Sequence, residues 1–351
     1  MNKIKLTLLL ILTVSITACF PSNKSDKSEV LLQGRTMGTT YHIKVVSTLE
    51  QVEALKLQDK IDAVLRQVNQ EMSTYIPDSE ISLFNKSTST DPIEISNGFS
   101  RVLAESIRLG ELSNGKLDIT VGPLVNLWGF GPEQRPEAVP SDEMLLNTRS
   151  RVGLKNLHLV GNRLSKDIPN LYVDLSTTAK GYGVDVVAEL LEANGFTSYL
   201  VEIGGEMRLK GFKRTGELWA IAIEKPIFDP SGEHRAVQQV IIPKDNAVAT
   251  SGDYRNYFEV DGQRFSHIID PDTGKPINHN LVSVTVISPL SMTADGLSTT
   301  LMVMGVEKGM AFAVENDLAA LFIYKTENGF EERFTVKFKQ YFKWSVSTKL
   351  L

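Results

Sequence analysis

The sequence predicts an α+β fold in which mixed or antiparallel sheets are covered by helices. Apolar and polar residues alternate at residues 40–46 and 280–287, as in strands that pack on one face. Apolar residues recur with the helical period at residues 50–72 and 180–193, which predicts helices packed on one side. The Walker A pattern is absent, and no G-x-G-x-x-G motif opens a βαβ unit, so a Rossmann dinucleotide fold is disfavoured.

The composition is that of an ordinary globular protein that can bury a substantial core. The chain has 351 residues, of which 42% are hydrophobic and 23% charged, enough for one large domain or two small ones. Its formal net charge is -5, without a basic cluster. Proteins that bind nucleic acid normally present a basic face, so we expect no nucleic-acid partner.

The first 18 residues have the pattern of a secretory signal. Two lysines precede an apolar run at residues 6–16, which is too short for a stable membrane span. The segment ITAC, which ends at Cys19, is similar to the lipobox of bacterial lipoproteins, in which the cysteine receives lipid and becomes the first mature residue. We therefore expect Cys19 to anchor the protein to a bacterial membrane, facing the periplasm. The alternative is a plain cleaved signal with an incidental cysteine.

The folded part is expected at residues 30–351, as one domain or two subdomains, after a polar and flexible tether at residues 19–29. Cys19 is the only cysteine, so the mature chain forms no internal disulfide. Before the first strand, Met37 offers a soft apolar surface for a flat ring, although a methionine is more often part of the core. His42, on the polar side of that strand, is most simply a solvated surface residue.

A second helix is expected to start at Ser96, which can cap its amides, and to stop at Asn114-Gly115. The stretch KLDITVGPLVNLWGFG follows at residues 116–131. Its glycines and Pro123 predict that no regular element forms there. Asp118 is one of several polar and stacking groups in this stretch, which is a candidate binding segment or a packed loop.

The segment YVDLSTTAKGYGVD joins the end of a strand at Asp174 to a helix that begins near Lys180. Exposed amides at a helix start attract anions, and Lys180 adds positive charge. Further on, two glycines at residues 204–205 permit close backbone approach to a ligand, or form a bulge. The sequence therefore indicates an anion site near the start of this helix.

Residues 291–304 are predicted to form a helix with Ser291 as its N-cap. Asp295 and Thr299 lie four residues apart, so their oxygens emerge side by side near the first turns, with Ser298 beside them. A carboxylate and a hydroxyl suit magnesium, which fills its remaining positions with water and substrate phosphates. Alternatively, Asp295 complements the helix dipole and Thr299 packs or bonds to a carbonyl.

Asp261-Gly262 predicts a hairpin turn between the strands YFEV and QRFS. Between this hairpin and the turn DPDTG lies His267, which has the most site-like context of the five histidines. A structural hydrogen bond is the alternative role for this histidine. Residues 318–325 and 332–342 read as strands that close the sheet.

Seven segments together identify a resemblance. RTMGTTY, MSTY, LDITVGPLVNLWGFGP, VDLSTTAKGY, EIGGE, TSGDYRNYFEVDGQRFSHIIDPDTGKP and TADGLSTTLMVMG resemble the motifs of the FAD:protein FMN transferases, the ApbE family of flavin transferases. The resemblance covers nearly the whole mature chain. It implies an enzyme that binds FAD and magnesium in a cleft between sequence-distant segments, splits the FAD pyrophosphate and attaches FMN to a threonine of a target protein, releasing AMP.

The resemblance also implies a set of site residues. The flavin and adenine contacts would be Met37, Tyr75, Lys116, Leu117, Asp118, Asp174, Lys180 and Ile269. The magnesium ligands would be Asp295, Thr299, Ser298 and a backbone oxygen at Thr177, although family members can carry Asp in place of Ser298.

The reaction centre of the family includes the HxxDP segment. We therefore expect His267 to accept the threonine proton or to orient the nucleophile, with Asp270 in support. The implied targets are membrane-bound flavoproteins of sodium-pumping and electron-transfer complexes. Two alternatives share the same pocket: a magnesium-dependent FAD pyrophosphatase that yields FMN and AMP, and a flavin-binding protein outside the cytoplasm without catalysis.

Overall fold

The computed structural model describes residues 27–131, 139–227, 236–253, 257–260 and 263–343. The expected signal segment, Cys19 and the Asp261-Gly262 turn lie outside the described residues. The first strand begins at Ser28, so the last two residues of the expected tether pair with the neighbouring strand.

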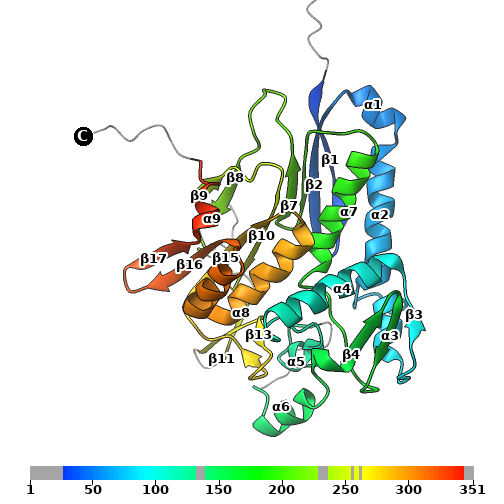
Figure 1. The fold of residues 1–351 in the computed structure, drawn as a ribbon, viewed down its shortest axis with the longest axis vertical. Coiled ribbons are helices and arrows are strands. Elements are labelled where there is room, and N and C mark those ends of the chain that lie inside the picture. Colours follow the sequence, from blue (N-terminus) through cyan, green and yellow to red (C-terminus); the bar gives the residue numbers. More distant parts are fainter. Residues whose placement is uncertain (1–26, 132–138, 228–235, 254–256, 261–262, 344–351) are drawn as a thin grey trace, which may run out of the picture.

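An eight-stranded sheet forms the centre of the molecule (Figure 1), in the order β1-β2-β6-β7-β10-β15-β16-β17. Every neighbouring pair of its strands is antiparallel, which confirms the α+β prediction and the exclusion of a Rossmann fold. The strands are β1 Ser28–Thr36, β2 Thr39–Ser47, β6 Tyr199–Ile203, β7 Glu206–Lys210, β10 Ala247–Gly252, β15 Leu281–Ser288, β16 Ala319–Thr326 and β17 Gly329–Phe334.

Smaller sheets and helices surround this sheet. The short strands are β3 Ile93–Glu94, β4 Leu157–Val160, β5 Arg163–Lys166, β8 Ile221–Glu224, β9 Val237–Ile241, β11 Tyr257–Val260, β12 Gln263–Ser266, β13 Ile269–Asp270 and β14 Lys275–Pro276. The helices are α1 Leu49–Ala54, α2 Leu57–Met72, α3 Glu80–Lys86, α4 Asn97–Leu112, α5 Gly122–Leu127, α6 Asp142–Arg149, α7 Ala179–Ala193, α8 Ser291–Glu315 and α9 Val336–Lys339, with a 3₁₀ turn at Leu154–Asn156.

Helices α7 and α8 lie side by side against one face of the sheet (Figure 1). On β16, Ala320 and Phe322 pack in the cluster that contains α8, whereas Leu321 and Ile323 pack in a second cluster with β8, β9 and α9. Successive residues of β16 therefore point to opposite faces of the sheet, and both faces are buried. The face with Ala320 and Phe322 packs against α8.

Among the described helices, α8 is the one that is long and apolar enough to cross a membrane by length and composition. In its most apolar 18-residue window, 56% of the residues are buried inside the protein. The apolar composition of α8 is accounted for by its place in the core.

The structure corrects four local predictions. The single helix expected at residues 50–72 is two helices, because Lys56 adopts a left-handed conformation with φ of 48° between α1 and α2. Helix α5 forms where no element was expected, since Pro123 sits in its first turn, where no intrahelical N–H is required. The C-terminal stretch contains α9 in addition to strands. Ser291 is the first residue of α8 and is not its N-cap, a position taken by Leu290.

Candidate functional site

A cavity of about 930 Å³ lies between segments that are far apart in the sequence. Its walls come from β2, the turns before α3 and α7, the loop before α5, the β6–β7 turn, β10, the segment after β12, and α8. It is lined by eleven of the expected site residues, namely Tyr75, Lys116, Leu117, Asp118, Asp174, Thr177, Lys180, His267, Ile269, Asp295 and Thr299. Met37, Asp270 and Ser298 are not among its lining residues.

The start of α8 presents oxygens to this cavity. Asp295 is only 4% exposed, and its Oδ2 accepts the backbone amide of Gly181 at 3.0 Å. The hydroxyl of Thr299 lies 3.0 Å from the hydroxyl of Ser251 on β10. Burial, followed by the charge of Glu206, raises the pKa of Asp295 to about 8. Below about pH 8 the protonated form of Asp295 is therefore favoured, and a metal cation next to the carboxylate would shift it to the ionised form.

Ser298 is held in a supporting position behind this surface. It is fully buried, its hydroxyl lies 2.7 Å from that of Ser251, and it donates to the Asp295 carbonyl at 2.9 Å. Because the side chain is already bonded and does not line the cavity, the structure does not place Ser298 with the other expected ligands. The buried Thr177 hydroxyl, in contrast, has no hydrogen-bond partner in the described part of the chain.

An ion pair stands beside Asp295. The Nζ of Lys180, in the first turn of α7, lies 2.8 Å from Oε1 of Glu206 at the start of β7. Burial lowers the pKa of Lys180, but the charges of Glu206 and Asp295 outweigh burial, so the pKa is raised and the ammonium is retained. Glu206 was not predicted as a site residue, although it directly follows the two glycines that indicated close approach to a ligand.

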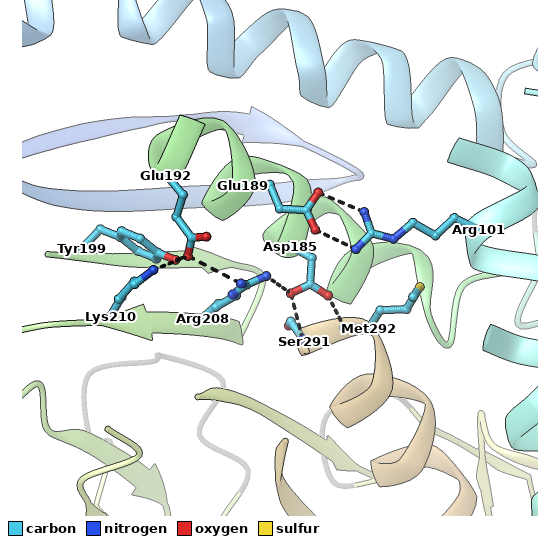
Figure 2. A network of polar contacts seen from close by, with 9 residues as sticks. All are labelled: Arg101, Asp185, Glu189, Glu192, Tyr199, Arg208, Lys210, Ser291 and Met292. Carbon is cyan, nitrogen blue, oxygen red and sulfur yellow. Dashed lines mark hydrogen bonds and ion pairs between the residues drawn. The ribbon is translucent and has the colours of Figure 1, made fainter. Parts of the chain in front are cut away.

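Asp185 fixes the start of α8 from the neighbouring helix (Figure 2). Its two carboxylate oxygens accept the amides of Ser291 at 3.0 Å and Met292 at 2.9 Å, and Arg208 contacts it at 3.1 Å. Asp185 therefore accepts the helix amides that an N-cap side chain would otherwise accept, so Ser291 is not needed as the cap. The two helix starts also touch, because a Cβ on Gly181 would lie 2.5 Å from the carbonyl oxygen of Ser291.

Three carboxylates hold the loop before α5, one from the loop itself and two from the segment after His267. Asp118 accepts the amide of Thr120 at 2.7 Å and the amide of Leu154 at 3.2 Å, and burial raises the pKa of Asp118. Lys116 reaches Asp270 at 3.0 Å and Asp272 at 2.7 Å. Asp270 therefore orients Lys116 from outside the cavity.

His267 lines the cavity at the end of β12. Its ring centroid lies 6.3 Å from that of Phe130, which belongs to a group of packed aromatic rings with Phe258, Phe265 and Trp128. Trp128 also donates its indole N–H to the carbonyl of Gly274 at 2.9 Å. The aromatic packing therefore anchors the segment that carries His267.

Three further residues differ in how they meet the cavity: Met37 packs away from it, whereas Tyr75 and His42 line it. Met37 adopts φ of 49° between β1 and β2, and its methyl group would lie 2.7 Å from a Cβ on Gly183, so it packs against α7. Tyr75 is 70% exposed at the cavity. His42 is not simply a solvated surface residue, since it lines the cavity with Nδ1 2.8 Å from Glu202.

The donor set suits magnesium. No group of three or more His, Cys, Asp or Glu side chains that could hold a metal is found among the described residues. A cation at Asp295 would depend on that carboxylate, on neutral protein oxygens, on water and on ligand phosphates. Magnesium is commonly bound in this way, by one or two carboxylates together with substrate phosphates.

Comparisons with known proteins identify the family of this chain. A model of the ApbE family matches residues 37–322. A relative from Vibrio cholerae serotype O1, named FAD:protein FMN transferase, is 56% identical over 313 residues, which cover 89% of this chain and 92% of that protein. A relative of the same name from Haemophilus influenzae is 49% identical over 340 residues, with coverage of 94% and 95%.

Solved structures give the same result. Flavin Transferase ApbE from Vibrio cholerae matches with a TM-score of 0.83 and 54% identity, covering 90% of this chain and 99% of that one. The apo form of Pseudomonas stutzeri flavinyl transferase ApbE matches with a TM-score of 0.82 and 40% identity, covering 91% and 98%. The resemblance and the fold prediction are thereby confirmed, and the chain belongs to the ApbE family.

Proposed function

We propose that the protein is an FAD:protein FMN transferase that moves FMN from FAD to a threonine hydroxyl of a target protein in a magnesium-dependent reaction. The activity follows the name shared by several relatives, one of which is 56% identical over 89% of the chain. The observation that carries the proposal is the juxtaposition of Asp295, Thr299 and Lys180 in one cavity, where they offer oxygens for a cation and an ammonium for phosphates.

Magnesium, when bound, would offset the negative charge on the oxygens of the phosphate under attack and on the leaving AMP. Asp295, Thr299 and the backbone oxygen at Thr177 would hold it, while Lys180 meets the diphosphate as a fixed positive charge. Lys116, oriented by Asp270 and Asp272, places a second ammonium at the cavity wall.

His267 is the proton acceptor in this scheme. As the threonine oxygen forms its bond to the FMN phosphorus, His267 takes the hydroxyl proton, and the bond between that phosphorus and the oxygen of AMP breaks. AMP leaves with the bonding electron pair. The threonine then carries FMN through a phosphoester.

Incubation of the protein with FAD, magnesium and a flavin-acceptor subunit tests the proposal. Covalent flavin fluorescence on a denaturing gel supports transfer. Free FMN and AMP without labelled protein would indicate a pyrophosphatase instead, and neither product would indicate a flavin carrier. His267→Ala should slow labelling by at least about a hundredfold with FAD affinity unchanged, and a rate near wild type would contradict its role.

The proposed site of action is the cell envelope. Lipid on Cys19 would hold the enzyme at a bacterial membrane that faces the periplasm, near threonine-containing acceptor flavoproteins of membrane redox complexes. Cys19→Ala should move the protein from the membrane fraction to the soluble fraction. An unchanged distribution would contradict lipid anchoring.

A further inference from the structure

Glu206 is a buried carboxylate, and one of its two oxygens has no partner among the described residues. Its side chain lines the cavity, yet the residue is only 3% exposed. Oε1 pairs with Lys180 at 2.8 Å, whereas Oε2 is buried and has no hydrogen-bond partner among the residues that the structure describes. A buried polar atom without a partner is costly, so Oε2 is expected to meet a donor when the cavity is filled.

The charges around Glu206 indicate which ligand it meets. Glu206 pairs with Lys180, and Asp295 accepts the amide of the next residue, Gly181, so two buried carboxylates lie at the start of α7 beside one ammonium. A divalent cation would remove this excess of negative charge, whereas an anion at Oε2 would increase it.

We propose that Glu206 positions both charges of the magnesium and diphosphate site, an inference that rests on the function proposed above. Oε1 holds Lys180 toward the diphosphate. Oε2 accepts a hydrogen bond from hydration water of the magnesium ion, so that Glu206 supplies a second negative charge without being a direct ligand. Magnesium in proteins usually keeps several waters, and carboxylates that bind such waters raise metal affinity.

A purely structural ion pair is the competing explanation, and it predicts different results. If Glu206 only joins β7 to α7, its substitution lowers stability but leaves magnesium affinity unchanged. If Glu206 acts on the cation, Glu206→Gln weakens magnesium binding even where folding is intact, because the amide keeps an acceptor for Lys180 but loses the charge.

The test is calorimetric titration of the full protein with magnesium in the absence of FAD. Wild type, Glu206→Gln, Glu206→Asp and Glu189→Gln are compared. Glu189 is a control for the loss of a paired carboxylate away from the cavity: it pairs with Arg101 at 2.6 Å (Figure 2), its side chain is 41% exposed, and it does not line the cavity. Thermal unfolding of each variant checks that it is folded.

We expect Glu206→Gln to weaken magnesium binding by about tenfold or more, Glu206→Asp to recover part of the loss, and Glu189→Gln to match wild type. In transfer assays, Glu206→Gln should raise the magnesium concentration needed for half-maximal rate by the same factor. A folded Glu206→Gln protein with wild-type magnesium affinity overturns the inference. If wild type itself neither binds magnesium nor transfers FMN, the proposed function fails instead.

Discussion

Asp295 is 4% exposed and bonded to a backbone amide, whereas Tyr75, in the same cavity, is 70% exposed and lies in a turn. The helical part of the cavity consists of Lys180, Asp295 and Thr299, at the starts of α7 and α8. The loop part includes Tyr75, and also Lys116 and His267. The helical part is preorganised by bonds between helices and strands, as expected for groups that meet a small cation and phosphates. The loop part carries its side chains on irregular segments, which are common positions for ligand contacts.

Removal of the carboxylate in the helical part is expected to have the largest effect. Asp295→Ala should reduce the rate of FMN transfer by about a thousandfold, because the cation loses its only buried carboxylate among the proposed ligands. The rate is measured from covalent fluorescence, with Glu189→Gln as the control. A reduction of less than about tenfold would show that the cation binds elsewhere.

The capping carboxylate of α8 is expected to control stability. Asp185→Ala removes the closer of the two carboxylates that pair with Arg208, the other being Glu192 at 3.6 Å, and leaves two helix amides uncapped, so we expect a loss of about 3 kcal/mol in the free energy of unfolding. Urea unfolding measures the change, and Asp185→Asn should lose less because it keeps an acceptor. A loss below about 1 kcal/mol would mean that the start of α8 does not depend on this contact.

The pH dependence of magnesium binding separates the two parts further. The pKa of Asp295 is raised to about 8, so its contribution to stability is present below pH 4 and is lost as pH rises to about 8. Magnesium binds the ionised form and releases a proton. Its affinity should therefore rise by about tenfold for each pH unit between pH 6 and 8, and then level off. Calorimetry at four pH values tests this, and a flat profile contradicts it.

The smallest effect is expected in the loop part. Tyr75→Ala should weaken FAD binding by about three- to tenfold, since one exposed ring contact is lost, without change in the unfolding free energy or in magnesium affinity. Tyr75→Phe should restore the affinity. Flavin fluorescence measures FAD binding. A change in magnesium affinity would contradict the prediction that the helical part and the loop part act separately.

Local spacing was enough to predict part of the site. Asp295 and Thr299 share a helix face because four residues make about one turn, and Lys180 stands in the first turn of α7. The prediction of mixed or antiparallel sheets followed from alternating strands and from the absence of Rossmann motifs. These features depend on neighbours in the sequence, which a single chain displays directly.

Contacts between distant segments could not be predicted in the same way. Ser298 is turned into a supporting role by Ser251, a residue on β10. The amides of α8 are capped by Asp185 of α7, so the expected cap at Ser291 was unnecessary. Glu206 enters the site only because β7 is placed beside α7, a choice made by the packing of the whole sheet.

The close approach at Gly181 has a consequence for the whole catalytic arrangement. Since the main chain of α7 meets the main chain of α8 at this point, the distance between the two helix starts that carry Lys180 and Asp295 is set by backbone atoms. A single methyl group at position 181 would push the starts of α7 and α8 apart. It would thereby spoil the match to magnesium diphosphate while leaving both of those residues chemically intact.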